Sequence, residues 1–192
     1  MSLSEPVSRR PSHQRTIVYR SFEREDGLWD IEGELRDEKA SPFQDRERGL
    51  MAPGEPVHNM LARVTIDKEM KIHEVEIGMD AVPFAFCGAA GAGAQGLIGA
   101  RLGRDWRRTL QLNLGGTRGC THLKEMLFGI ATVAFQTFPV QWDAPQTGDG
   151  EPAPKKPFFL DGCHSWALDS PVVKRHFPQY YTGDDDRPED AG

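Results

Sequence analysis

The chain has 192 residues and a mass of 21.4 kDa, which suits one domain because chains usually divide only beyond ~250 residues. Charged residues make up 27% and the mean hydropathy is −0.54, so we expect part of the chain to stay outside a packed core. No segment approaches the ~18 consecutive apolar residues of a membrane span, and the N-terminus lacks the apolar stretch of a secretory signal. The sequence therefore predicts a soluble, cytoplasmic protein with no membrane partner.

The net charge of −6 is concentrated at the C-terminus, where residues 183–192 carry a charge of −4. The rest of the chain is close to neutral, whereas nucleic-acid binding needs clustered Lys and Arg to replace the counterions of phosphate. We therefore expect no nucleic-acid partner. The three cysteines, Cys87, Cys120 and Cys163, form no C-x-x-C pair, and an odd number argues against a disulfide framework.

The first part of the chain predicts a hairpin between two irregular segments. Residues 1–15 are rich in Ser, Pro and Arg and are expected to be disordered. Residues 16–23 and 27–35 are rich in β-branched and aromatic residues on either side of an Asp-Gly turn, which is typical of two paired strands. Residues 37–56 contain three prolines and two glycines with no apolar period, so a long loop is expected there.

Residues 57–67 and 71–79 each alternate apolar and polar positions, the pattern of a half-buried strand. The short connection between them predicts an antiparallel hairpin. In this phase His58 and His73 lie on the apolar faces of their strands. Both rings would then point toward the core, and burial there lowers the pKa of an imidazole.

The next segments are harder to assign. Residues 88–96, GAAGAGAQG, are expected to be flexible, and they lack the lysine and the glycine spacing of nucleotide-binding loops. Residues 97–103 predict a short helix or turn. Residues 107–116 predict a strand, because four residues alternate with polar ones: Arg108, Leu110, Leu112 and Leu114.

Residues 121–138 form the strongest predicted helix, since seven apolar residues recur at helical spacing before Pro139. Residues 141–157 contain four prolines and predict a second long loop. Beyond it we expect short irregular or helical pieces, and then the disordered acidic tail over 183–192. The predicted fold is α+β: a single domain over 16–182 with a mostly antiparallel sheet of about five or six strands folded around the 121–138 helix.

The segment Gly115–Leu123 is a glycine-rich turn that leads into this helix. Free N–H groups and the helix dipole at a helix N-terminus favour an anion, favour the thiolate of Cys120 and disfavour the imidazolium of His122. A neutral His122 could act as a base or as a polarising donor, and Arg118 or the helix N-terminus could hold an anionic group. The alternative, left open by the sequence, is that Thr121 only caps the helix and Cys120 packs as a small apolar residue.

Thr121, Gln136 and Trp29 are further predicted substrate contacts of this candidate site. Gln136 lies on the same helical stripe as His122, together with Met126, Gly129 and Val133, and Trp29 could contact an aromatic substrate. A zinc or iron site is the minority alternative, with four ligands that match no standard spacing: Cys120, His122, Cys163 and His164. His58 or Cys87 could complete such a set.

Several short segments resemble a family of bacterial proteins, domain of unknown function family 2889. The most distinctive is Gly119–Leu123, and the others are Asp26–Gly33, Pro56–Met60 with Arg63–Asp67, Pro83–Cys87, Gln136 and Leu160–Cys163. Asn59 stands where we expect an Asp in the family pattern. The resemblance covers Thr16 to Tyr180 and implies an accessory role in bacteria that consume aromatic compounds.

Two hypotheses follow. The first is a cofactor-independent lyase or isomerase for a small, hydroxylated aromatic molecule, in which His122 and His58 are acid and base, assisted by Cys120. Retro-aldol cleavage that releases formaldehyde from a lignin-derived phenol is the favoured reaction, a choice that follows from the family resemblance and not from the spacing of residues. The second is an accessory or assembly module that binds a metal or ligand and has no catalysis of its own. A homo-oligomer is compatible with either.

Overall fold

The computed structural model describes residues 3–103, 105–137, 156–157 and 159–183. Contacts within the chain divide it into two compact units, Met1–Pro139 and Val140–Gly192, where the sequence predicted one domain. The predicted loop over 141–157 lies almost entirely outside the described residues, as does the acidic tail beyond residue 183. No helix in the described part of the chain has the length and apolar character needed to cross a bilayer.

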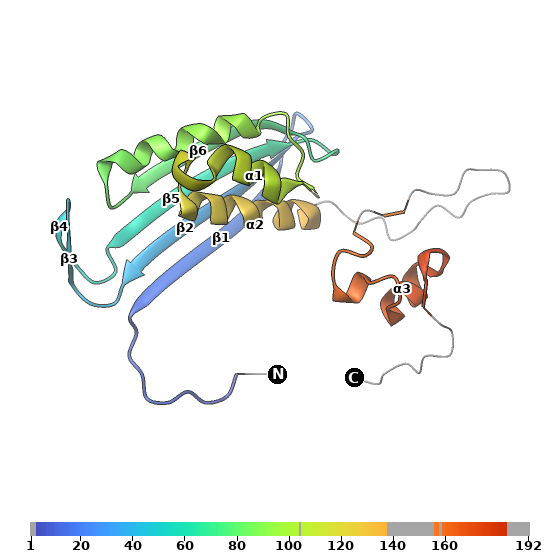
Figure 1. The fold of residues 1–192 in the computed structure, drawn as a ribbon, viewed down its shortest axis with the longest axis horizontal. Helices are drawn as coiled ribbons and strands as arrows, with labels where there is room; N and C mark the ends of the chain where they lie inside the picture. The colour runs from blue at the N-terminus through green and yellow to red at the C-terminus, as the bar shows by residue number, and fades with distance from the viewer. Residues whose placement is uncertain (1–2, 104, 138–155, 158, 184–192) are drawn as a thin grey trace. The chain divides into compact units, whose positions relative to one another are not determined.

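The first unit has a mixed α+β fold built on a four-stranded antiparallel sheet in the order β1-β2-β5-β6 (Figure 1). The strands are β1 (His13–Glu23), β2 (Trp29–Lys39), β5 (Pro56–Ile66) and β6 (Ile72–Ala81). Both predicted hairpins are confirmed, β1 with β2 around the Asp26-Gly27 turn and β5 with β6. A separate small hairpin pairs β3 (Phe43–Asp45) with β4 (Gly49–Met51).

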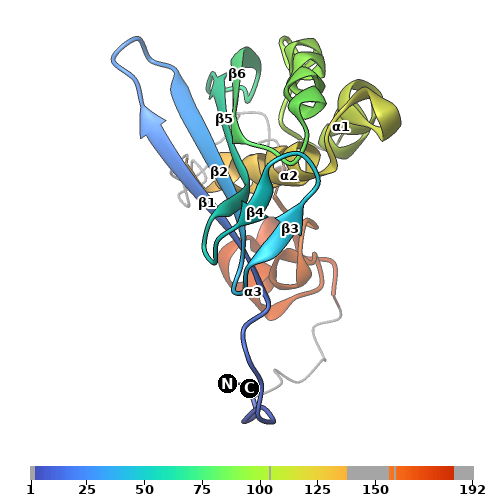
Figure 2. The ribbon, with the colours of Figure 1, turned by 90° about the vertical axis from the view of Figure 1, so that its left-hand side faces the viewer.

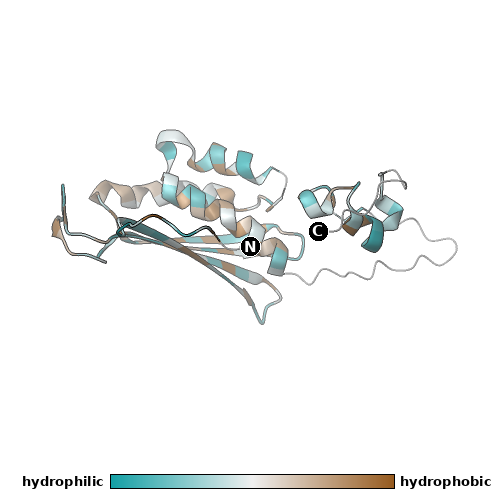
Figure 3. Ribbon diagram, turned by 90° about the horizontal axis from the view of Figure 1, so that it is seen from below, coloured by the Kyte–Doolittle hydropathy of each residue, from teal (hydrophilic) through white to brown (hydrophobic). Residues whose placement is uncertain are grey.

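The helices lie on one side of this sheet (Figure 3). They are a 3₁₀ helix η1 (Ala85–Leu97), α1 (Trp106–Leu114), a 3₁₀ turn η2 (Gly116–Arg118) and α2 (Thr121–Thr137). The predicted helix is confirmed as α2, which packs on β1, β2 and β5, whereas η1 packs on β6. The sheet has four strands instead of five or six, and it carries a helical layer of several elements on one face.

Side-chain hydrogen bonds to backbone carbonyls connect the layers. The Tyr19 hydroxyl donates to the Met126 carbonyl at 2.9 Å, and the Trp106 indole N–H donates to the Leu127 carbonyl at 3.1 Å. Both carbonyls are on α2, so this helix is fixed from the sheet side and from α1. The core around it is apolar and includes Ile31, Leu35 and Val64 from the sheet.

Three segment predictions at the ends of the sheet are wrong. Residues 3–12 have no helix or strand, but β1 begins at His13, so the last part of the segment 1–15 is ordered. The predicted loop 37–56 contains the end of β2 and the β3–β4 hairpin. His73 is exposed, because the ladder pairs Thr65 with Glu74 and Ile66 with Ile72 and so skips His73 at a β-bulge.

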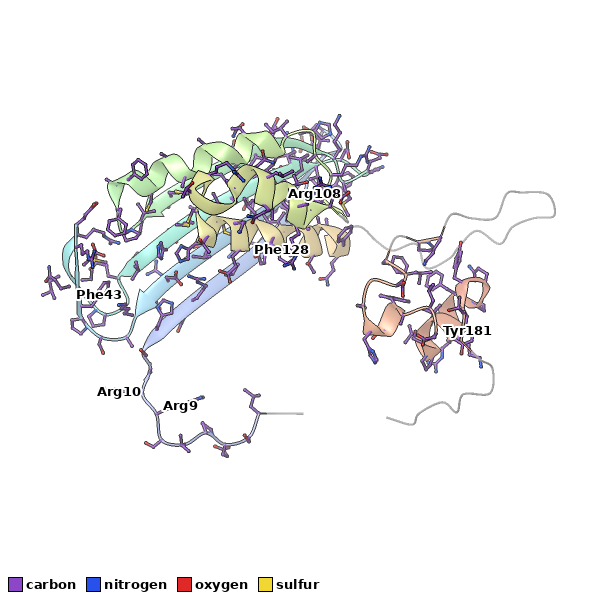
Figure 4. All side chains as sticks on the ribbon, viewed as in Figure 1. Arg9, Arg10, Phe43, Arg108, Phe128 and Tyr181 are labelled. Carbon is purple, nitrogen blue, oxygen red and sulfur yellow. The ribbon has the colours of Figure 1, made fainter. Side chains whose placement is uncertain are left out.

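Two predictions in the helical layer are also wrong. Residues 107–114 of the predicted strand form most of α1, whose buried side chains Trp106, Leu110 and Leu114 recur every four residues. Leu112 is 62% exposed, and Arg108, labelled in Figure 4, is also exposed. The stretch 88–96 belongs to η1, where glycine permits close packing: a Cβ at Gly93 would lie 2.7 Å from the Asn113 carbonyl oxygen.

The described part of the second unit has the short helical pieces that the sequence predicted. They are the 3₁₀ turns η3 (His164–Trp166) and η4 (Pro178–Tyr180) and the helix α3 (Pro171–His176). Ser170 caps α3 by accepting a hydrogen bond from the Val173 N–H. A small core of its own contains Leu160, Val173 and Phe177.

Candidate functional site

The candidate site lies where β1 and β5 begin, β2 ends and α2 begins, the end of the sheet that faces the viewer in Figure 2. Asp37 of β2 lies opposite Arg15 of β1 and opposite His58 of β5 in the strand register. The β2–β5 register shifts between Asp37 and Glu38. Such a bulge redirects side chains locally, and it lies beside His58.

Asp37 is the centre of the site. Its side chain is 2% exposed, and its two oxygens accept hydrogen bonds from Arg15 Nε and Nη2 at 2.8 and 2.7 Å. His58 Nδ1 lies 3.0 Å from Oδ2, and His13 Nε2 lies 3.3 Å from Oδ1. Burial acts to raise the pKa of Asp37, but the Arg15 hydrogen bonds and charge, with smaller contributions from His58 and His13, bring it below its usual value. Asp37 is therefore a buried carboxylate ion at neutral pH.

His58 and His122 form a pair of imidazoles, with ring centroids 4.0 Å apart and planes inclined by 36°. Burial lowers the pKa of His58, and Arg15 and His13 add to this, while Asp37 opposes it. Burial also lowers the pKa of His122, with further contributions from His58 and Arg15 against those of Asp37 and Glu125. With both pKa values below the usual 6.5, both rings are neutral at pH 7 and can exchange protons.

Cys120 approaches the other side of this pair. Its Sγ lies 3.7 Å from His122 Nδ1, and both side chains are half-buried. The carbonyl of Cys120 accepts the first hydrogen bond of α2, from the Lys124 N–H at 3.0 Å, so Cys120 is the N-cap residue and the exposed Thr121 is the first residue of the helix. Thr121 is therefore not the cap that the alternative interpretation required.

The structure brings His58, His122 and Cys120 together, with Thr121 between the last two in the chain, and places Trp29 and Gln136 far from them. Trp29 is in the core at the opposite end of β2, about 26 Å from Asp37 along the strand. Gln136 is exposed near the far end of α2, roughly 21 Å along the helix from His122. Arg118 is exposed, and its guanidinium donates to the Gln111 carbonyl at 3.0 Å.

The metal set predicted from the sequence combines residues of both units, since Cys163 and His164 belong to the second. Within the described residues, Asp37, His58 and His122 have ligand atoms that all lie within 4.8 Å of one another. Both oxygens of Asp37 already accept hydrogen bonds from Arg15. This arrangement is typical of a carboxylate that orients a histidine through hydrogen bonds.

Sequence reasoning missed Asp37, Arg15 and His13, although a signal for the first was present. Ile31, Gly33, Leu35 and Asp37 occupy every second position of β2. The acid therefore continues the core-facing side of the strand, where a charge requires a partner. The same phase aligns Arg15 with Ile17 and Tyr19 on β1. Asn59 occupies the position where we expected an Asp in the family pattern, and its Nδ2 lies 3.4 Å from an oxygen of Asp80. The carboxylate partner of His58 is instead Asp37.

Comparison with models of protein families finds a match over residues 13–136, described as protein of unknown function (DUF2889). The chain belongs to this family. The DUF2889 match contains all the residues of the candidate site, from His13 to His122, and ends before the second unit. The resembling segment Leu160–Cys163 lies outside the match. Searches of curated proteins and of solved structures found no match.

Proposed function

We propose that this DUF2889 protein is a cofactor-independent acid–base enzyme, a lyase or isomerase acting on a small hydroxylated molecule in the bacterial cytoplasm. The observation that carries the proposal is the pair of neutral imidazoles, His58 and His122, one of which is bonded to the buried carboxylate Asp37. A histidine with its pKa below neutrality is a competent base at pH 7. A buried carboxylate on Nδ1 stabilises the imidazolium that forms when the other nitrogen takes a proton.

Each residue receives a role. His58 is the base, and its free nitrogen is Nε2 because Nδ1 faces Asp37. His122, being neutral, donates a hydrogen bond and polarises the reacting oxygen, and Cys120 lies against its Nδ1. Arg118 and Thr121, both exposed at or just before the start of α2, are proposed to contact the substrate.

The proposed reaction is retro-aldol cleavage of a hydroxymethyl group. His58 removes the hydroxyl proton, the C–O bond becomes a carbonyl as the neighbouring C–C bond breaks, and the electron pair of that bond passes to the other carbon, where the conjugated ring of the substrate delocalises it. The imidazolium of His58 then returns the proton to that carbon, so R–CH₂OH gives R–H and formaldehyde. We propose a lignin-derived phenol as the R group, which rests on the family resemblance.

Turnover of hydroxymethyl-bearing phenols, followed by formaldehyde release, tests the proposal. We expect His122→Ala and His58→Ala each to lower turnover by ~10²–10⁴ with the fold intact, because loss of a general acid–base group costs that much. His73→Ala is the matched control, since His73 is an exposed histidine bonded to Asp67 on the same sheet. A His122 variant that melts early but keeps its activity per folded molecule would contradict the assigned role.

The second candidate is the metal- or ligand-binding accessory module, which the spacing of Asp37, His58 and His122 favours. Metal analysis of untagged protein separates the two. Stoichiometric zinc or iron that is lost in His58→Ala would support the accessory module. Full activity in protein freed of metal by a chelator would support the acid–base enzyme.

A further inference from the structure

Arg15 connects three elements at the candidate site. Its Nε and Nη2 bind the two oxygens of Asp37 on the neighbouring strand, at 2.8 and 2.7 Å. Its remaining Nη1 donates to Glu125 Oε2 of α2 at 2.6 Å. One guanidinium thus joins β1, β2 and the first turns of the helix that carries His122.

This two-point contact restricts the carboxylate of Asp37. A planar guanidinium that binds both oxygens fixes the plane of the carboxylate as well as its charge. Oδ2, which accepts from Arg15 Nη2, also faces His58 Nδ1 at 3.0 Å. A carboxylate ion can only accept, so the proton between them belongs to the histidine.

We propose that Arg15 is a positioning residue for His58: by fixing Asp37 it holds the imidazole in the Nδ1–H tautomer and leaves Nε2 unprotonated. An imidazole in water prefers the other tautomer, with its proton on Nε2, so the protein must select this form through the bond on Nδ1. The inference deepens the proposed function and rests on it only for the role of Nε2 as the base. The tautomer itself can be observed without any substrate.

Arg63 supplies a matched control within the same sheet. It also bridges two acids on neighbouring strands, Glu32 at 2.8 Å and Glu76 at 2.9 Å. Its side chain is more exposed than that of Arg15, and within the described residues its hydrogen bonds and ion pairs are with these two acids and not with a histidine. If the loss of any arginine bridge changed the His58 tautomer, the change would appear in Arg15→Gln and in Arg63→Gln. A positioning role of Arg15 predicts the change only in Arg15→Gln.

The test is long-range ¹H–¹⁵N NMR of the histidine rings in the full chain at pH 8, where His58 is neutral. In the wild type we expect the Nδ1–H tautomer at His58. In Arg15→Gln and in Asp37→Ala we expect the larger part of the His58 population to convert to the Nε2–H tautomer. In Arg63→Gln we expect no change. Arg15→Lys, which keeps the charge without the two-point contact, is expected to convert part of the signal.

Two results would overturn the proposal: an Nε2–H signal for His58 in the wild type, or a retained Nδ1–H signal in Arg15→Gln. An Nε2–H signal in the wild type would overturn the proposal even where Arg15→Gln does not fold, and Arg15→Lys, which keeps the charge, then tests the role of Arg15 itself. The outcome is separate from that of the proposed function. If His58→Ala kept full turnover while Arg15→Gln changed the tautomer, the acid–base role would fail and the positioning role would stand.

Discussion

The surroundings of His58 and His122 disfavour the protonated rings, and the free energy of unfolding therefore depends on pH. Burial lowers the pKa of both His58 and His122 in the folded protein, whereas an unfolded chain has a histidine pKa of about 6.5. Below that pH these two histidines bind protons in the unfolded chain but stay unprotonated in the folded protein until the pH approaches their lowered pKa values. The contribution of these residues to stability is therefore complete above about pH 6.5 and is lost as pH falls toward their folded pKa values.

The first prediction is a fall in the free energy of unfolding between about pH 7 and pH 5, measured by urea denaturation. In a double variant, His58→Gln with His122→Gln, the free energy of unfolding should depend less on pH over this range because the titrating groups are gone.

Asp37 affects stability at lower pH. Its pKa is lowered in the fold, so its contribution is present above about pH 3.9 and is lost below it. A pH slope as steep in the double variant as in the wild type would contradict the assignment to these histidines.

Residue by residue, the sequence located half of the site. The apolar phase of β5 indicated that His58 faces inward, and the turn before α2 marked Cys120 and His122. It could not show which carboxylate meets His58, because Asp37 is 21 positions away and the contact depends on the pairing of β2 with β5. Arg15 was missed because its neighbours Arg9, Arg10 and Pro11 have the composition of a disordered segment.

At the scale of elements, the beginning of β1 is part of the site, which reverses the expectation for residues 1–15. Residues 3–12 are exposed and have no regular structure, whereas Arg15 lies opposite Asp37 in the ladder. Removal of residues 1–10 should leave the melting temperature and the His58 tautomer unchanged. Removal of residues 1–15 deletes Arg15, so we expect conversion of the tautomer and a melting temperature lower by several degrees. Equal behaviour of the two truncated chains in thermal melting and NMR would exclude this role for the start of β1.

The helical layer shows why local patterns misled. In α1 the residues Leu110 and Leu114 fit an alternating pattern and a helical one equally, since they are four positions apart. Leu112, halfway between them, distinguishes the two because it is 62% exposed, but its exposure cannot be seen in the sequence. In η1 the glycine content predicts flexibility, although several of the glycines lie against neighbouring atoms.

Alanine substitutions in η1 provide a prediction with an internal control. A Cβ at Gly93 would lie 2.7 Å from the Asn113 carbonyl oxygen, and that backbone cannot move away without disturbing α1. We expect Gly93→Ala to lower the free energy of unfolding by ~1–3 kcal/mol, the usual cost of overpacking. A Cβ at Gly88 would have no atom within 4 Å. Gly88→Ala should therefore leave the free energy of unfolding unchanged or raise it by less than ~1 kcal/mol. Equal effects in chemical denaturation would mean that η1 does not pack closely.

At the scale of the whole molecule, the described residues gather into two hydrophobic cores. The larger is formed by residues between Trp29 and Ala134, and the smaller by residues between Leu160 and Phe177. The family match ends at residue 136, close to the end of α2 at Thr137. Length alone suggested one domain, because it cannot show where apolar residues gather into separate cores. The division instead depends on which segments pack together.

A chain that ends at Pro139 tests whether the first unit is self-sufficient. Its core and every residue of the candidate site lie before this point, so we expect cooperative melting within a few degrees of that of the full chain and the same tautomer at His58. A chain that ends at Phe128 is the control: it lacks Ile130, Ala131 and Ala134, which α2 buries in that core, and should not fold cooperatively. If the Pro139 chain failed to fold, or folded with His58 in the Nε2–H form, the second unit would be required for the site. If it folded with the tautomer and formaldehyde release intact, the chemistry would belong to the part of the chain that defines the family.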